Sequence, residues 1–423
     1  METSPVLALA LGSRGDVEPL ALLAGALAAA GTPATVVAAS EYEALVRSHG
    51  AGFAGIGFVM ADMERLGRGW LGRAGLRSPL VQPALLARWF TGLAAPFADT
   101  VLEVVRPGCL VVTGVAARDS ALALVQSHGC RMATVLHTAV LPTAQPESHL
   151  EGHRRLGSSR VEAAASRWYW EAVSGLSRSA ASVLRERTGL HPASARASTA
   201  AADRYPILLA ADPVLVPPAP DWPQTCRQTG AVLAPAAGDW EPPEPLRSFL
   251  AAGEPPVYVG LGSLNGMGGQ DWLALVEYAA RLSGRRVATP ALPGETPRVL
   301  GGGRVCTVAD APHAALFPRL SGIVHHGGAG TTAAALRAGV PSVGVPAMFD
   351  QHYHARRLAE LGVGPWPVPL HRITGARLAV LLAGVAGGAY AERAAAVGAE
   401  ARSSDGLSTA LAALQGLSPR PGM

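Results

Sequence analysis

Residues 325–332 read HHGGAGTT, after the apolar pair Ile323-Val324 and before a helical pattern at 333–338. A buried strand that runs into a glycine-rich turn and then a helix gathers several backbone N–H groups around one point. The helix N-terminus adds roughly half a positive charge, and glycines let an anion approach the backbone closely. Hydroxyls of Thr331 and Thr332 add donors at the cap, and His326 can donate to a phosphate oxygen. The stretch indicates a phosphate or diphosphate site; a tight turn with a threonine N-cap is the alternative.

The next apolar run, 341–346, leads to a carboxylate and an amide, Asp350 and Gln351. Ligands of open α/β sheets lie at the carboxyl ends of the strands, so we expect these side chains at the same edge as the glycine turn. A carboxylate beside an amide accepts from and donates to vicinal hydroxyls. The alternative is that Asp350 only caps the helix that extends to Leu361.

A second glycine loop, Gly12 to Asp16 (GSRGD), follows the apolar run 6–11 and precedes a helical pattern at 17–30. With the apolar run 35–39 this predicts a β-α-β unit of a parallel sheet. Asp16 can take a proton from a hydroxyl or an amine, while Ser13 and Arg14 can steady an anion. Alternatively, Asp16 is the helix N-cap. The G-x-G-x-x-G spacing is absent, which argues against a nicotinamide dinucleotide.

The chain shows a proline-dense stretch between two such β-α patterns. Eight prolines lie between residues 217 and 245, and a strand-loop pattern, VYVGLGS, restarts at 257–263. Proline clustering of this kind is typical of a linker between domains. The sequence therefore predicts an α/β protein of two successive β-α-β domains.

Composition excludes several classes of protein. The 423 residues carry 35 Lys+Arg and 31 Asp+Glu, and every one of the 35 is arginine, which excludes P-loop NTPases and Schiff-base lysine enzymes. The arginines are scattered, so we expect no nucleic-acid partner. Four separated cysteines predict free thiols in a reducing cytoplasm. We expect no secretory signal and no membrane segment, because Gly31 to Pro33 interrupts the uncharged stretch 20–40.

Taken together, these motifs resemble the family-1 GT-B glycosyltransferases. The resemblance rests on HHGGAGTT, on AGVP at 338–341, on Asp350-Gln351, on the loop at 12–19 and on PPVYVGLGS at 255–263. It is nearest to actinobacterial enzymes that glycosylate antibiotics, including the glycopeptide type, with sterol glucosyltransferases further off. It implies two facing Rossmann-like domains with a central cleft. The implied ranges are an acceptor-binding domain at 1–216, a linker at 217–245, a nucleotide-sugar domain at 246–390, and a C-terminal helix at 391–414 that packs back on the first domain. We expect a break in this helix at Asp405-Gly406.

The resemblance also assigns roles to single residues. It implies that Asp16 is the general base and that Asp350 and Gln351 hold the donor sugar. The implied contacts of the donor diphosphate are Ser13, Ser263, His326, Gly328, Gly330 and Thr331. Arg14 joins these candidates because of its charge and its place in the first glycine loop, not through the resemblance. The chain contains no Asp-x-Asp, and helix positions i and i+2 diverge at His352 and His354, so we expect no metal and no cofactor.

Two segments depart from the family pattern. TPALPG at 289–294 replaces an Arg-Gly-Trp segment, and ADAPH at 309–313 replaces the usual base contact. The preference between a TDP-sugar and a UDP-sugar is therefore left open. Aromatic rings and an imidazole of the first domain are candidates for contact with a flat, apolar acceptor, with core packing as the alternative. These candidates are Trp70, Trp89, His137 and Trp168.

The expected function is an inverting, hexosyltransferase-type glycosyl transfer in antibiotic biosynthesis. The donor is a TDP- or UDP-sugar, and the acceptor is a hydroxyl or an amine of a natural-product aglycone. A nucleotide-sugar epimerase or phosphorylase, and a non-catalytic partner of the same fold, are the alternatives. We expect a monomer by default, located in the cytoplasm.

Overall fold

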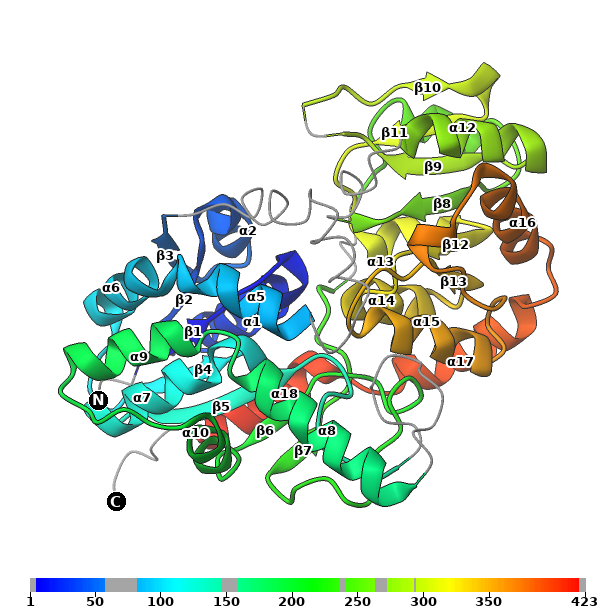
Figure 1. The fold of residues 1–423 in the computed structure, drawn as a ribbon. Helices are drawn as coiled ribbons and strands as arrows, with labels where there is room; N and C mark the ends of the chain where they lie inside the picture. The colour runs from blue at the N-terminus through cyan, green and yellow to red at the C-terminus, as the bar shows by residue number, and fades with distance from the viewer. Residues whose placement is uncertain are drawn as a thin grey trace. The chain divides into compact units, whose positions relative to one another are not determined.

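The computed structural model describes residues 5–57, 82–145, 158–235, 240–262, 272–292 and 294–417. The chain divides into two compact units, Met1–Leu233 with Asp405–Met423, and Ala234–Ser404 (Figure 1). The division after Leu233 falls inside the proline-rich segment predicted as a linker. Each unit is described by itself.

The first unit is built on a seven-stranded sheet in which each pair of neighbouring strands is parallel. The strand order is β3-β2-β1-β4-β5-β6-β7. Their bounds are β1 Val6–Leu9, β2 Ala34–Ala39, β3 Gly52–Ile56, β4 Leu110–Thr113, β5 Arg131–Leu136, β6 Ile207–Leu209 and β7 Cys226–Gln228. The direction of winding reverses between β1 and β4, and in open α/β sheets ligands bind at such a reversal. The loop that carries Asp16 follows β1 and therefore lies at this point.

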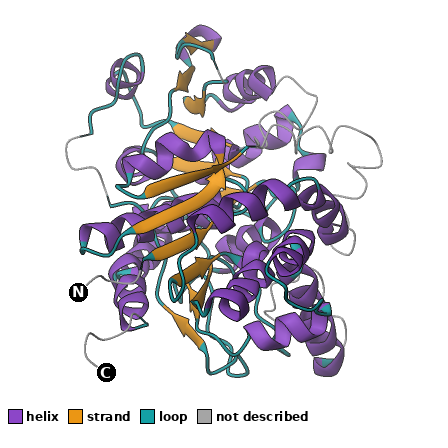
Figure 2. Cartoon of the chain, turned by 90° about the vertical axis from the view of Figure 1, so that its left-hand side faces the viewer, coloured by secondary structure: helices purple, strands orange, loops and turns teal. Residues whose placement is uncertain are grey.

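The helices of this unit pack on the sheet or on one another, and strands and helices are distinguished by colour in Figure 2. They are α1 Arg14–Ala29, α2 Glu43–Ser48, α5 Gln82–Thr91, α6 Ala94–Val104, α7 Arg118–His128, α8 Ser159–Ser174, α9 Arg178–Arg187, α10 Ala195–Ala202 and α18 Gly406–Gly416. Apolar residues of α1 and of the strands form one core, to which Ala410 and Leu414 of α18 belong. A buried guanidinium joins α7, α8 and the end of α10, because Arg118 of α7 pairs with Asp203 at 3.0 Å and lies over the Trp170 ring of α8.

The second unit has a six-stranded sheet of the order β10-β11-β9-β8-β12-β13. Its pairs are parallel except for β10 with β11. The strands are β8 Val257–Gly260, β9 Val287–Pro290, β10 Val299–Leu300, β11 Val305–Val308, β12 Gly322–His325 and β13 Ser342–Gly344. The helices are α11 Leu246–Ala251, α12 Trp272–Ser283, α13 His313–Leu316, α14 Ala329–Ala338, α15 Gln351–Glu360, α16 Gly375–Ala386 and α17 Ala391–Arg402. Here the winding reverses between β8 and β12, and the glycine turn follows β12.

The C-terminal segment at 391–414 forms two helices, with the break at the predicted position, Asp405-Gly406. It differs from the prediction in its packing: α18 packs on α1 of the first unit, whereas α17 packs on α14 of the second. The contact of α17 is close, since a Cβ on Gly398 would lie 2.6 Å from the carbonyl oxygen of Leu336. The helix breaks before Asp405, whose carboxylate accepts the Ser408 N–H at 3.0 Å and starts α18 as a new helix.

Gly406 gives a direct test of how α18 is seated. A Cβ at this position would overlap the backbone carbonyls of Gly230 and Ala231, whereas a Cβ on Gly416, at the other end of α18, meets nothing within 4 Å. We expect Gly406→Ala to lower the free energy of unfolding of the first unit by about 1–3 kcal/mol, because overpacking strains the backbone. Gly416→Ala is the control and should not lower the free energy of unfolding in urea, because its added Cβ meets no described residue and alanine favours a helix over glycine. Equal stability of the two variants would contradict this packing.

The four cysteines are free thiols, as predicted. Two of them meet in space although 21 residues separate them, with the sulfur atoms of Cys109 and Cys130 3.2 Å apart in the buried region that precedes β4 and β5. Within the described ranges, no single helix is long and apolar enough to cross a membrane, although 375–386 and 391–416, bent by 73°, meet the same criterion as a pair.

Candidate active site

The glycine turn of the second unit ends in an exposed helix N-terminus. Gly328 is the N-cap of α14, and its carbonyl accepts the Thr332 N–H at 2.9 Å and the Thr332 hydroxyl at 2.8 Å. The helix starts at Ala329, four residues before the predicted start, because this backbone bond already closes the first turn. The N–H groups of Ala329, Gly330 and Thr331 therefore precede the first N–H that donates within the helix, that of Thr332, and point out of the helix end. Thr332 is buried, and its N–H and its hydroxyl both donate to a carbonyl of its own helix end. The prediction that its hydroxyl is a donor at the cap for an anion is therefore wrong.

The glycines of this turn are required for different reasons. Gly327 has φ +88°, and a Cβ there would lie 2.6 Å from the carbonyl oxygen of Gln351. A Cβ on Gly328 would overlap the His326 ring, so both positions are set by packing within the protein. Gly330 is exposed and a Cβ there meets nothing within 4 Å. The open space that an anion needs thus lies at Gly330.

His326 stands beside this helix N-terminus. Burial lowers the pKa of its imidazole to about 4, and the nearby His313 and His354 act in the same direction. Its Nδ1 is buried without a hydrogen-bond partner among the described residues. A Cβ on Gly262, just beyond β8, would lie 3.1 Å from the ring. The ring is therefore neutral at pH 7 and lies where the loops after β8 and β12 meet.

Asp350 and Gln351 lie at the start of α15, where Asp350 is the N-cap. The side-chain oxygen of Gln351 accepts the N–H groups of Ala347 at 2.9 Å and Met348 at 3.2 Å. This oxygen is committed to the turn, so only the Gln351 NH₂ group can donate to a ligand. Phe349 has φ +49°, a left-handed conformation that non-glycine residues adopt at a cost and that recurs at functional sites.

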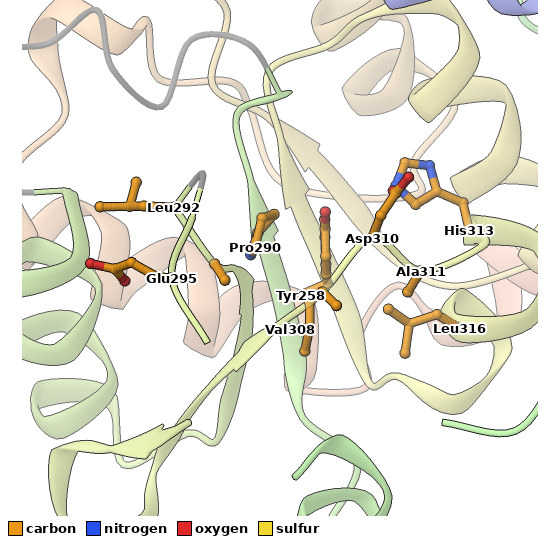
Figure 3. A pocket seen from close by; sticks show the side chains of 11 residues that line it. Tyr258, Pro290, Leu292, Glu295, Val308, Asp310, Ala311, His313 and Leu316 are labelled. Atoms are coloured by element: carbon orange, nitrogen blue, oxygen red, sulfur yellow. The ribbon is translucent and has the colours of Figure 1, made fainter. Parts of the chain in front are cut away.

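A pocket of about 300 Å³ opens beside the ends of β8, β9 and β11 in the same unit (Figure 3). Most of its lining residues are apolar, but Glu295, Asp310 and His313 give its walls a polar share as well. The His313 ring stacks on Phe317 with centroids 4.3 Å apart, and Tyr258 lies edge-on to His313. The two segments that depart from the family pattern, 289–294 and 309–313, both line this pocket, which the sequence alone did not bring together. Its remaining lining residues are Pro290, Ala291, Leu292, Val308, Ala309, Ala311 and Leu316.

In the first unit, Asp16 lies in the first turn of α1. Ser13 is the N-cap, which corrects the alternative that Asp16 is the cap. The Asp16 Oδ2 accepts the Ser13 N–H at 2.8 Å and the Ser13 hydroxyl at 3.1 Å, so the carboxylate has a fixed orientation. Gly12 makes room for it, because a Cβ at Gly12 would overlap Oδ2. Asp16 is half-buried at the point where the winding of the sheet reverses.

Arg14, a candidate for the diphosphate, points along the surface of α1. It is exposed, and its Nε pairs with Glu18 Oε2 at 3.0 Å, one turn further along the helix. To bind an anion, the Arg14 guanidinium would have to divide its N–H donors between the anion and Glu18.

The candidate acceptor-binding residues differ in how deeply they are buried. Trp89 of α5 is buried, and its ring packs edge-on against Phe90 with the centroids 4.8 Å apart. Core packing therefore accounts for this tryptophan. Trp168 of α8 is 45% exposed and His137 follows β5. Burial lowers the pKa of His137 to about 4. Trp70 and the diphosphate candidate Ser263 lie outside the described residues.

Comparisons with known proteins identify the family of this chain. Residues 287–410 match the family model for the C-terminal domain of erythromycin biosynthesis protein CIII-like proteins. The dTDP-epi-vancosaminyltransferase of Amycolatopsis orientalis is 32% identical over 86% of each chain. The chain belongs to the antibiotic glycosyltransferase family. The O-mycaminosyltylonolide 6-deoxyallosyltransferase of Streptomyces fradiae is 42% identical, over 41% of this glycosyltransferase and 40% of its own length.

The fold agrees with this assignment. The glycosyltransferase SsfS6 of Streptomyces sp. SF2575, solved with thymidine diphosphate, superposes with a TM-score of 0.65 at 18% identity, over 98% of this chain and 99% of that one. The predicted α/β fold of GT-B type, with two Rossmann-like sheets, is therefore confirmed. Sequence reasoning missed Tyr258 and Glu295 of the pocket, although Tyr258 lies inside the quoted strand, because no spacing links strand residues that meet only in the folded sheet.

The lowered histidine pKa values predict a stability that depends on pH. His137 and His326 titrate near 6.5 in the unfolded chain and near 4 when folded, so unfolding takes up protons between these values. The free energy of unfolding should be fully retained above pH 6.5 and fall toward pH 4 by up to about 3 kcal/mol per histidine. In urea unfolding at pH 7.5 and 4.5, His137→Gln should lose less stability than wild type between the two pH values. An equal loss would contradict the assignment.

Proposed function

We propose that this glycosyltransferase moves a sugar from a thymidine or uridine diphosphate sugar to a hydroxyl or an amine of an apolar natural-product aglycone, with inversion. The observation that carries the proposal is the open helix N-terminus at Gly330 in the same unit as a pocket of nucleoside size. His313 connects the two features, since it lines the pocket and also affects the pKa of His326.

The second unit would hold the donor along one sheet edge. The pocket takes the base and ribose between apolar walls, and Glu295 or Asp310 accepts from ribose hydroxyls. The first N–H groups of α14 take the diphosphate. Asp350 accepts from hydroxyls of the sugar and the Gln351 NH₂ donates to them.

The proposed step forms one bond and breaks one. The acceptor oxygen or nitrogen attacks the anomeric carbon, the bond from that carbon to the phosphate oxygen breaks, and the proton of the acceptor passes to Asp16. Negative charge grows on the departing diphosphate, where the α14 N–H groups and the N–H of neutral His326 stabilise it. The described residues contain no group of three or more His, Cys, Asp or Glu side chains that could hold a metal ion, so these donors carry the charge in the proposal.

Relatives favour the thymidine donor within this proposal. The Amycolatopsis orientalis relative is named for a dTDP-sugar donor, as a dTDP-epi-vancosaminyltransferase, and SsfS6 was solved with thymidine diphosphate. The pocket lining includes residues of the segments 289–294 and 309–313, which depart from the family pattern. The preference for a thymine or a uracil base is therefore the property to measure first.

The test is mass spectrometry of the full chain with TDP- and UDP-sugars, each with and without a panel of apolar hydroxyl and amine acceptors. The proposal expects a glycosylated acceptor only when both substrates are present, with the anomeric configuration inverted by NMR. A sugar isomer formed from the donor alone would instead establish an epimerase. Nucleotide binding without any product would establish a non-catalytic protein.

A further inference from the structure

We infer that His325 and His354 are positioning residues that clamp the peptide groups of Gly327, and so hold the phosphate-binding turn in register with the sugar-binding turn. The inference deepens the proposed function and rests on it. Neither imidazole contacts the donor in that proposal, and the family signature leaves His354 without a role.

The two imidazoles hold Gly327 from both sides. Nδ1 of His325 accepts the Gly327 N–H at 3.0 Å, and Nδ1 of His354 donates to the Gly327 carbonyl at 2.9 Å. Both side chains are fully buried. His325 must therefore carry its proton on Nε2, whereas His354 carries one on Nδ1. The two histidines have opposite roles at the same residue.

Gly327 needs such support because its backbone is unusual and enclosed. Its φ of +88° is left-handed, and it packs against the carbonyl of Gln351. A buried peptide group without a hydrogen-bond partner is costly, so loss of either imidazole nitrogen would let the turn rearrange. Gly328, the N-cap of α14, is the next residue, so any shift of Gly327 moves the anion site.

The clamp also joins two elements that are far apart in the sequence. His325 ends β12, whereas His354 lies in the first turn of α15, the helix that has Asp350 as its N-cap and Gln351 as its first residue. The His354 Nδ1 is also 3.8 Å from the Asp350 carboxylate. Burial and the neighbouring histidines hold the pKa of His325 well below its ordinary value, which keeps its Nδ1 available as an acceptor.

The experiment compares asparagine with leucine at each position in the full chain. The asparagine side chain places an oxygen or an NH₂ group where imidazole has Nδ1, and leucine fills similar space without a polar atom. The four variants are His325→Asn, His325→Leu, His354→Asn and His354→Leu. All lose the ring, so differences within a pair report the Nδ1 contact and not packing.

Two measurements are made on each variant. Hydrogen–deuterium exchange of the peptide that contains Gly327 needs no ligand, and titration with thymidine diphosphate reports the anion site. We expect the leucine variants to exchange faster and to bind thymidine diphosphate about tenfold more weakly. The asparagine variants should bind within about threefold of wild type.

The inference is overturned if leucine and asparagine variants behave alike in both measurements, or if the leucine variants match wild type. A wild-type chain that binds neither thymidine nor uridine diphosphate would refute the proposed function instead. The order of exchange rates, with leucine faster than asparagine, would then still decide whether the clamp exists.

Discussion

Asp16→Asn should lower kcat by about two to four powers of ten, while the affinity for thymidine diphosphate stays within about twofold of wild type. The loss follows from removing the proposed base, since an amide cannot take the proton of the acceptor. Asparagine is the informative change, because its side-chain oxygen can still accept the Ser13 N–H that now binds Asp16 at 2.8 Å. Alanine would also remove this cap and cost about 0.5–2 kcal/mol of stability, which would mix two effects.

The control for Asp16 is another carboxylate of the first unit. Glu43 is exposed on α2 and pairs with Arg47 at 2.8 Å, so Glu43→Gln should change neither kcat nor binding. Steady-state kinetics with a saturating donor and acceptor measure the effect. Turnover of Asp16→Asn within threefold of wild type would remove Asp16 from the role of base.

Gly330→Ala should weaken binding of thymidine diphosphate by about 10–100-fold without lowering stability. In a helix the Cα–Cβ bond tilts toward the N-terminus, so the new methyl group enters the space from which an anion approaches. The affinity lost corresponds to one hydrogen bond to a charged group. Stability should not fall, because the methyl group meets no atom of the described residues within 4 Å beyond its own helix turn, and alanine favours a helix by about 0.5–1 kcal/mol over glycine.

Gly384→Ala in α16 of the same unit is the matched control. The nearest atom to its added Cβ is Pro365 Cγ at 3.6 Å, an ordinary contact, so binding should stay at the wild-type level. Calorimetric titration and thermal unfolding measure both properties on both variants. Wild-type affinity in Gly330→Ala would show that the diphosphate does not approach this turn.

The motifs at the two winding reversals were predictable because their information is local. Apolar runs, glycine turns and the residues after them fix where a strand ends and a helix begins, and the order of the patterns along the chain indicates two parallel sheets. Asp16, His326 and Asp350 became candidate site residues in this way, and their roles are part of the proposal. The start of α14 was placed four residues too late, since the sequence did not reveal that the Gly328 carbonyl closes the first turn.

The remaining features depend on contacts between distant segments. The pocket brings Tyr258 of β8 together with residues near 290 and 310, which no sequence spacing relates. The division of the C-terminal segment between the units depends on how Gly398 and Gly406 fit against carbonyl groups elsewhere. His354 was considered only as a metal ligand beside His352, because its partner, the Gly327 carbonyl, is 27 residues away.

A crystal structure of the full chain with thymidine diphosphate tests the location of the donor most directly. The predicted result is a diphosphate with oxygens about 3 Å from the first N–H groups of α14, and a pyrimidine ring in the pocket beside Tyr258 and His313. Thymidine diphosphate bound at another place, with the N–H groups of Ala329 to Thr331 facing only water, would contradict the proposal.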